Sequence, residues 1–327
     1  MTTNAVTIIY HADCIDGFGA AYAAWHNFGE RAHYCPMHHG EAWDSAALSG
    51  HNVYILDFSF PPEQLSAIAA VARSVTQIDH HLSAHQAWAG LLQPGTNQLE
   101  AYHAADTCLS VLFNLEKSGA RLAWEHFQPE QTLPLILGHI EDQDLWRFAL
   151  PGTREICRAL RLLPFDFTRW AELIATTPAI TSPAYQQMLA QGAAINDYMQ
   201  QEVDGLANSR LRMPARLRGD PVDAMQALRH GQTVISDRGL NWLAVSGIAI
   251  NANALFASEL GNQLAEQSGT FALIWQLASD GEVKASLRSK GNFDVAAIAT
   301  RYGGGGHRNA AGFRLPAAQF MAEVLQA

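Results

Sequence analysis

Residues 76–85 read TQIDHHLSAH, and in this stretch an acid and two adjacent imidazoles follow directly on a short apolar run. These residues are Asp79, His80 and His81. Histidine is a common metal ligand and the side chain whose charge changes most readily near neutral pH, whereas aspartate binds cations through oxygen. The tripeptide alone fits a metal site and a polar loop equally well. Its chemistry therefore depends on what the rest of the chain brings to the same place.

Groups of the same kind follow two other apolar runs, at 6–10 and 53–56. The groups that follow them are His11, Asp13, Asp16 and Asp57. If these runs and the run at 75–78 are parallel strands, their carboxyl ends share the edge at which ligands bind in open parallel sheets. We therefore expect three strands to deliver acids and imidazoles to one edge. A helix in TLPLILGHIEDQDLW would add Asp142 and Asp144.

Carboxylates gathered in one crevice repel one another unless cations compensate their charge. Imidazoles beside them make a mixed oxygen and nitrogen ligand set, which suits Mn²⁺ or a similar first-row divalent ion better than Ca²⁺. The ligands suffice for two ions, and two ions about 3.5–4 Å apart can activate water and hold a phosphoryl group. The alternative is that each acid caps a helix N-terminus after its strand.

The composition is that of an ordinary soluble chain of 327 residues, with 48% hydrophobic residues and a formal net charge of −10. The charge disfavours long duplex nucleic acid as a substrate, since binding it needs many Lys and Arg on one face. No apolar run approaches the roughly 20 residues of a membrane span, so no membrane partner is expected. The four cysteines form no CxxC pair, and with no secretory signal in view we expect a cytoplasmic location.

Apolar runs alternate with helical patterns over residues 1–182, which predicts an α/β domain with a mainly parallel sheet. Helices are expected in DTCLSVLFNLEKSG and TLPLILGHIEDQDLW. Residues 183–214 contain a long helical pattern and are expected to connect two domains. The sequence pattern of residues 215–327 predicts a smaller α+β domain with a hairpin that turns at Asp280-Gly281.

Four segments taken together resemble the DHH phosphoesterase superfamily, in which a DHH domain precedes a DHH-associated C-terminal domain. They are HADCIDGFGAA near the N-terminus, the strand ending in Asp57, DHH at 79–81, and GGGGHRNAAGF at 303–313. Within the superfamily, CIDGFGAAYAAW and IEDQDLWRF are most similar to the oligoribonuclease and cyclic-nucleotide phosphodiesterase-like branch. The resemblance covers nearly the whole chain and implies a two-domain enzyme with a dinuclear Mn²⁺ centre.

The resemblance also implies a role for each matching residue. His11 would bind the first ion and Asp16 the second, and Asp57 would bridge both. His80 and an acid of GHIEDQDLW would complete the second site. His81 would face the phosphate, so catalysis is expected to depend on His81 and Asp57.

The first motif departs from its commonest form, in which two acids separated by one residue precede the glycine. Here Cys14 stands two places before Asp16, and Asp13 lies one place earlier. Asp13 could take over as a ligand, and this is the assignment we adopt. Alternatively, Cys14 could be a ligand itself, could support the ligands from behind, or could leave the first metal site more open. A thiolate would favour Zn²⁺ or Fe²⁺ over Mn²⁺, and Mg²⁺ is a further alternative.

The segment GHIEDQDLW offers two acids, Asp142 and Asp144, that cannot both reach the metals, because residues i and i+2 of a helix lie on different faces. From its place in the motif we choose Asp142 as the ligand, and Asp144 would then orient a ligand or pair with Arg147. His139 shares a face with Asp142 and could support the ligands from behind. A packed helix histidine is the alternative for His139.

The glycine run near the C-terminus lets backbone N–H groups approach an anion without obstruction by Cβ atoms. The resemblance implies that Gly304, Gly305, Gly306 and His307 hold the phosphate or terminal nucleotide of the substrate. Arg288 matches a position that faces substrate in similar proteins, and arginine can bind phosphate through two hydrogen bonds. The alternative for the glycine run is a flexible loop, and the alternative for Arg288 is a surface ion pair.

The function expected from these features is metal-dependent hydrolysis of phosphodiesters in short oligonucleotides or small nucleotides. No Ser-His-Asp or GxSxG pattern stands out, so the nucleophile expected is a metal-activated water. Single-strand exonuclease action and hydrolysis of phosphomonoesters or polyphosphate are alternatives. A non-catalytic nucleotide sensor is the alternative from another class, and Cys14 in place of an acid is the feature that favours it.

Overall fold

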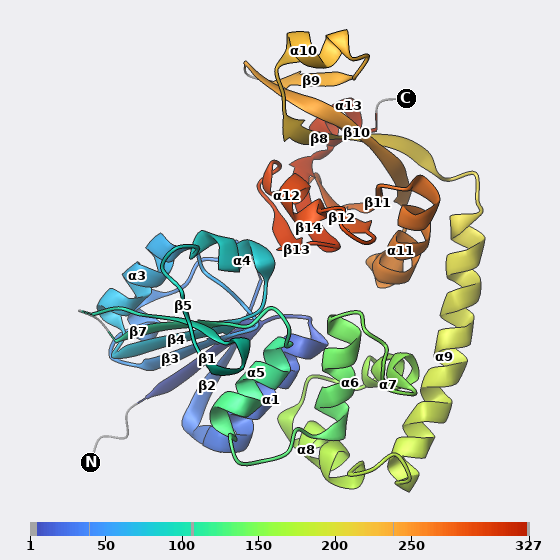
Figure 1. Cartoon of the computed structure of the whole chain (residues 1–327). Coiled ribbons are helices and arrows are strands. Elements are labelled where there is room, and N and C mark those ends of the chain that lie inside the picture. The colour runs from blue at the N-terminus through green and yellow to red at the C-terminus, as the bar shows by residue number, and fades with distance from the viewer. Residues whose placement is uncertain (1–4, 39, 106–107, 238, 326–327) are drawn as a thin grey trace. The chain divides into compact units, whose positions relative to one another are not determined.

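The computed structural model describes residues 5–38, 40–105, 108–237 and 239–325. The chain divides into two compact units, an N-terminal unit, Met1–Asp197, and a C-terminal unit, Tyr198–Ala327. The division falls within α9 (Pro183–Ala207), the long helix expected to connect the domains (Figure 1). Because α9 contributes to both units, the boundaries expected at 182 and 214 stay a prediction. In the part of the chain that is described, no helix has both the length and the apolar character needed to cross a membrane.

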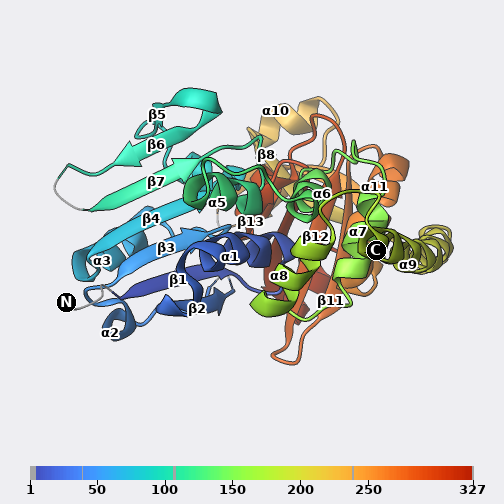
Figure 2. The same cartoon turned by 90° about the horizontal axis from the view of Figure 1, so that it is seen from below.

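A mainly parallel sheet forms the centre of the N-terminal unit (Figure 2). Its strands, in the order in which they lie side by side, are β2 (Ala32–Met37), β1 (Val6–His11), β3 (Asn52–Leu56), β4 (Ser74–Asp79), β7 (Leu109–Phe113), β6 (Glu100–His103) and β5 (Gln93–Pro94). The pairs from β2 to β7 are parallel, and β6 and β5 continue the sheet antiparallel. The strands predicted at 6–10, 53–56 and 75–78 are therefore confirmed, and they are neighbours.

Helices pack on both faces of this sheet, which explains why its central strands are almost continuously apolar. In β1, Ile8 joins a core with α1 and α5, while the next residue, Ile9, joins a separate core with α3. The helices of the unit before α9 are α1 (Ile15–Phe28), α2 (Ser45–Leu48), α3 (Pro62–Val71), α4 (Leu82–Ala87), α5 (Gly119–Phe127), α6 (Leu135–Asp144), α7 (Thr153–Leu160) and α8 (Phe167–Thr176). The helix predicted in TLPLILGHIEDQDLW is confirmed as α6.

The helix predicted in DTCLSVLFNLEKSG is wrong, because 109–113 form strand β7. Residues 106–107 of this segment lie outside the described residues. A short apolar run does not by itself distinguish a buried strand from a helix. Here β7 is buried between β4 and β6 and pairs with both, so tertiary pairing decided its conformation.

The C-terminal unit contains a second, mostly antiparallel sheet. Its strands are β8 (Met213–Pro221), β9 (Val234–Asp237), β10 (Leu240–Asn251), β11 (Phe271–Leu277), β12 (Glu282–Ser289), β13 (Gly305–His307) and β14 (Ala310–Pro316). The accompanying helices are α10 (Ala224–Arg229), α11 (Ala257–Ser268), α12 (Val295–Thr300) and α13 (Ala317–Glu323). The predicted hairpin is confirmed: β11 and β12 pair antiparallel across a turn in which Gly281 has a φ of 83°. The α/β plus α+β fold class is confirmed with it.

Candidate metal centre

The three strand ends that the sequence singled out lie next to one another at one edge of the N-terminal sheet. His11 ends β1, Asp57 directly follows β3, and Asp79 ends β4. These strands are adjacent in the order β1-β3-β4 and all run parallel. The chain leaves β1 toward β2 on one side and returns to β3 on the other, and this reversal of strand order is where parallel sheets place ligand sites.

Asp57 lies at the centre of the group, with an exposed fraction of only 2%. Its Oδ1 is 3.0 Å from Nε2 of His80, and its Oδ2 is 3.5 Å from Nδ1 of His11. Burial alone would raise the pKa of Asp57, but hydrogen bonds from His11 and His80 hold it well below its usual range. The backbone of Asp57 is left-handed, with a φ of 51°, and strained conformations of this kind persist mainly at functional sites.

Asp16 faces the same centre from the first turn of α1. Its carboxylate accepts hydrogen bonds from the backbone N–H groups of Gly119 and Ala120, at 2.7 and 3.0 Å, and so caps the N-terminus of α5. Its Oδ2 also lies 3.6 Å from Nε2 of His80. The capping alternative therefore holds for Asp16, although the helix it caps is not the one that follows its own strand. Capping and facing the centre are compatible, because one carboxylate has enough lone pairs for both.

Two glycines make this close approach possible. A Cβ on Gly17 would lie 2.3 Å from the carbonyl oxygen of His11, so only glycine lets α1 start directly against the end of β1. A Cβ on Gly119 would lie 2.5 Å from Cβ of Asp57. Sequence reasoning did not single out either glycine as a site residue. For Gly17, the available signal was its position directly after the motif acid Asp16. For Gly119, nothing in the surrounding sequence SGAR differs from an ordinary helix start.

We expect Gly119→Ala to disturb the centre, since the new Cβ would also lie 2.7 Å from Oδ1 of Asp57. Overpacking of this kind costs about 1–3 kcal/mol, and here it should also weaken metal binding by displacing Asp57. Gly138→Ala is the matched control, because its Cβ would approach no atom closer than 3.8 Å and alanine favours a helix interior. Urea unfolding and metal titration of both variants check this. Equal behaviour of the two variants would contradict the close contact at Gly119.

Besides a group of Asp57, Asp79, His80 and His81, the described residues of the N-terminal unit form two groups of potential ligand atoms, in each of which all atoms lie within 4.8 Å of one another. One group is His11, Cys14 and Asp57, and the other is Asp16, His80 and Asp144. The 3.0 Å contact between His80 and Asp57 joins the two groups. The structure therefore brings together five residues that the sequence singled out as ligands or supports, His11, Cys14, Asp16, Asp57 and His80, and adds Asp144 from GHIEDQDLW.

Two of the predicted ligands lie outside these groups. The side chain of Asp13 is 86% exposed, and its Oδ2 lies 3.6 Å from His38. The carboxylate of Asp142 accepts hydrogen bonds from the backbone N–H groups of Ala149 and Leu150 and from the hydroxyl of Thr153. The structure thus places Cys14 where Asp13 was expected, and Asp144 where Asp142 was expected.

His139 belongs to the same buried network as Asp142, away from the centre. Its Nδ1 lies 2.9 Å from the hydroxyl of Thr153, and its Nε2 lies 3.0 Å from that of Tyr185. Because both ring nitrogens are engaged and Thr153 also donates to Asp142, the network ties α6 to α7 and α9. The packed-histidine alternative describes His139 best.

The electrostatics of the centre fit a divalent cation. Burial, followed by the charges of Asp57 and Asp144, raises the pKa of Asp16 well above its usual range. Burial likewise raises the pKa of Asp144, and its buried Oδ2 accepts no hydrogen bond from the described residues. Burial and then the charges of Asp57 and Asp16 raise the pKa of the Cys14 thiol. A divalent cation would relieve this repulsion and coordinate the Asp144 oxygen, which lies 3.6 Å from Nε2 of His80.

Neighbouring carboxylates raise the pKa of both His80 and His81. Burial alone would lower the pKa of His80, but the hydrogen bond to Asp57 and the charge of Asp144 raise it to about 10. Asp79 is fully buried and its Oδ1 lies 2.7 Å from Nδ1 of His81. Burial alone would lower the pKa of His81 too, and the charge of Asp79 raises it to about 9. Asp79, which sequence reasoning left without a role, therefore fixes the orientation of His81, with its other oxygen held by Ser59.

The predicted substrate residues of the C-terminal unit lie in its sheet, except Gly304, which directly precedes β13. The guanidinium of Arg288 donates a hydrogen bond to the hydroxyl of Ser258, and the aliphatic part of the side chain lies against Gly261 of α11. Burial lowers the pKa of Arg288 to about 10. Gly305, Gly306 and His307 form β13, which pairs with β14. A Cβ on Gly304 would lie 1.9 Å from the carbonyl oxygen of Gly312, so close strand packing requires glycine there whether or not an anion binds.

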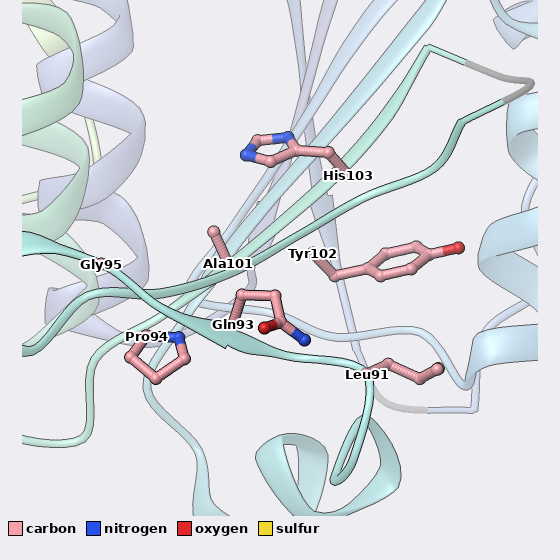
Figure 3. A pocket seen from close by; sticks show the side chains of 7 residues that line it. All are labelled: Leu91, Gln93, Pro94, Gly95, Ala101, Tyr102 and His103. Carbon is pink, nitrogen blue, oxygen red and sulfur yellow. The ribbon is translucent and has the colours of Figure 1, made fainter.

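An open hollow of about 520 Å³ lies beside the β5–β6 hairpin and is lined by Leu91, Pro94 and Tyr102 among others (Figure 3). None of the predicted site residues lines this hollow. It presents no cluster of acids or imidazoles, so it does not compete with the edge of the sheet as the candidate site.

Comparisons with known proteins bear on both units. Residues 243–327 match the DHHA1 domain family. Over 323 residues the chain is 28% identical to an uncharacterised protein of Acanthamoeba polyphaga mimivirus, in an alignment that covers 93% of this chain and 66% of the relative. The chain therefore spans just under two-thirds of the length of that relative.

Three solved structures are similar at low identity. A protein of Helicobacter pylori is 14% identical with a TM-score of 0.41, over 96% of this chain and 94% of that one. RecJ of Thermus thermophilus, solved with Mn²⁺, is 14% identical with a TM-score of 0.44, over 97% and 50%. A pGpG-specific phosphodiesterase of Vibrio cholerae is 10% identical with a TM-score of 0.39, over 96% and 94%.

The C-terminal match and the DHH tripeptide lie in different units of the chain. The DHH tripeptide stands at the carboxyl end of β4, in the same parallel sheet as β1, which ends in His11, and β3, which is followed by Asp57. The DHHA1 match covers the C-terminal sheet from within β10 onward. Residues 243–327 are therefore similar to the DHHA1 domain family, and a DHH tripeptide lies in the α/β unit that precedes them.

Proposed function

We propose that this chain is a divalent-metal-dependent phosphodiesterase that hydrolyses short oligonucleotides or small nucleotides. The observation that carries the proposal is the pair of ligand groups joined by Asp57. His11 and Cys14 would hold one ion, Asp16, His80 and Asp144 would hold the other, and Asp57 would bridge them. This assignment keeps the roles expected for His11, Asp16, Asp57 and His80 and replaces Asp142 with Asp144.

Two divalent ions held in this way would supply an activated water and neutralise negative charge on a phosphoryl group. The residues of the chain keep the ligands ionised and in place. Asp57 is held in its charged form by the histidines beside it. His81 is assigned to the phosphate: Asp79 fixes its ring through Nδ1, so that Nε2 would contact the substrate and hold or release a proton there.

The C-terminal unit would bind the rest of the substrate. Arg288 and the segment Gly304–His307 are the groups we assign to the phosphate or terminal nucleotide, as the DHHA1 match supports. The formal net charge of −10 favours short substrates, because long strands need an extended basic surface. The oligoribonuclease and cyclic-nucleotide phosphodiesterase-like branch is the part of the superfamily that we propose for this chain, and the cytoplasm its location.

A panel of substrates tests the proposal. Metal-stripped protein would be supplied with Mn²⁺, Zn²⁺, Mg²⁺ or chelator and given a 5′-phosphorylated dinucleotide, a longer single strand, a cyclic mononucleotide, a 3′,5′-bisphosphate and polyphosphate. We expect metal-dependent cleavage of the dinucleotide well above that of the longer strand. Preferred cleavage of the long strand would indicate a single-strand exonuclease instead. Tight nucleotide binding without cleavage by any metal would overturn the proposal in favour of a nucleotide sensor.

A further inference from the structure

The first motif of this chain places a thiol, and not a second carboxylate, beside His11 and Asp57. Nδ1 or Nε2 of His11, Sγ of Cys14 and a carboxylate oxygen of Asp57 all lie within 4.8 Å of one another. The acid that could have substituted for the thiol, Asp13, is 86% exposed and lies beside His38. The neighbouring acid of the motif, Asp16, belongs to the other group, with His80 and Asp144.

The backbone conformation of Asp13 and Cys14 determines that Cys14, and not Asp13, lies beside His11. Asp13 has a left-handed φ of 55°, which turns the chain between the end of β1 and the start of α1. Cys14 follows in extended conformation as the residue before the first turn of α1. The contact between Gly17 and His11 then holds α1 against β1, so the thiol stays close to the imidazole. Asp13 could join the group only if this turn were rebuilt.

The two groups differ in chemical softness. Asp16, His80, Asp144 and the shared Asp57 offer oxygen and nitrogen, which suit Mn²⁺ or Mg²⁺. His11, Cys14 and Asp57 offer nitrogen, sulfur and oxygen. Three protein ligands that include a thiolate, with a position left open, are characteristic of catalytic zinc, and soft thiolate ligands select Zn²⁺ over Mn²⁺.

We propose that Cys14 is a thiolate ligand and that the His11–Cys14–Asp57 group binds Zn²⁺, which makes the centre one of two unlike ions. The inference rests on the proposed two-ion site and adds the identity of one ion. Binding would release the thiol proton to solvent as the Zn–S bond forms, with no change of oxidation state.

Cobalt substitution tests this through an optical signal that does not depend on turnover. Metal-stripped full-length protein would be titrated with Co²⁺, because a cobalt–thiolate bond produces charge-transfer absorption in the near ultraviolet that oxygen and nitrogen ligands do not. We expect this absorption in the native chain and its loss in Cys14→Ser. A variant with both Cys35→Ser and Cys108→Ser is the matched control and should keep it, because neither of these cysteines belongs to a ligand group.

A second variant reports on selectivity. Cys14→Asp replaces sulfur with oxygen, so the preference of the protein for Zn²⁺ over Mn²⁺ should fall by at least about tenfold. Circular dichroism would establish that each variant is folded. Two bound Co²⁺ ions without thiolate absorption, or absorption that survives Cys14→Ser, would overturn the inference and leave the phosphodiesterase proposal standing. Thiolate absorption that depends on Cys14, in a protein that cleaves no member of the substrate panel, would overturn the phosphodiesterase proposal alone. Failure to bind Co²⁺ at all would overturn both.

Discussion

Asp57→Asn is expected to lower turnover by more than about 10³-fold, because a bridging carboxylate contributes several kcal/mol to holding and charging two ions. Asparagine keeps the shape of the side chain and removes its charge. It also tolerates the left-handed backbone of Asp57 better than other residues do. The loss should therefore reflect the missing charge and not a rebuilt turn. We expect the number of tightly bound divalent ions to fall together with the rate.

Asp13→Asn is the matched control for this prediction. Asp13 has nearly the same backbone conformation, with a φ of 55° against 51° for Asp57, and lies only two residues from His11. Its side chain, however, is exposed and outside both ligand groups. Rates on the dinucleotide and metal content after dialysis would be compared for the two variants. A near-native rate with unchanged metal content in Asp57→Asn would refute the bridging role.

The position of the centre could be predicted because it depends on a general property of parallel sheets. Short apolar runs predicted β1, β3 and β4, and each run ended in an acid or an imidazole. Their carboxyl ends had to meet if the strands were neighbours, and they are. Asp57 and His80 thus follow from strand order alone, without knowledge of any side-chain contact.

Which side chains lie in the candidate ligand groups depended on backbone details that residue types do not determine. Asp13 and Cys14 are adjacent, and a single left-handed residue decides which of them lies beside His11. Gly119 caused a similar difficulty. It contacts Asp57 across 62 positions of the chain, so no local pattern could reveal it. Strand β7 was missed for the same reason, since its pairing with β4 and β6 overrides its own ambiguous sequence.

The choice between Asp142 and Asp144 shows how a helix end resolves an ambiguity of two residues. Asp142 accepts two hydrogen bonds from the segment just beyond α6 and a third from Thr153, the first residue of α7. That segment turns sharply, with left-handed φ values of 55° at Trp146 and 48° at Phe148. Asp142 therefore stabilises the turn that ends α6, while Asp144 is left with an oxygen directed to the centre, 3.6 Å from His80.

Asp144→Asn and Asp142→Asn should consequently fail in different ways. Asp144→Asn is expected to lower turnover by more than about 10²-fold through loss of a metal ligand. The stability of the metal-free protein should stay unchanged or improve, because burial disfavours the charge of Asp144. Asp142→Asn is expected to cost about 2 kcal/mol of stability. An asparagine has one acceptor oxygen, and its NH₂ group would face the N–H donors of Ala149 and Leu150.

The pH dependence separates the two variants further. Hydrogen bonds from Thr153, Leu150 and Ala149 outweigh burial and hold the pKa of Asp142 below its usual range. The stability that its charge contributes is therefore fully present above the pKa of about 4 that an aspartate has in the unfolded chain, and it is lost as the pH falls through the folded pKa. Urea unfolding at pH 7 and pH 3 should thus show the native chain approaching Asp142→Asn in acid. The opposite outcome would be loss of a metal ion by Asp142→Asn at full stability, with both ions retained by Asp144→Asn. That result would make Asp142 the ligand and would require the turn beyond α6 to rearrange when metal binds.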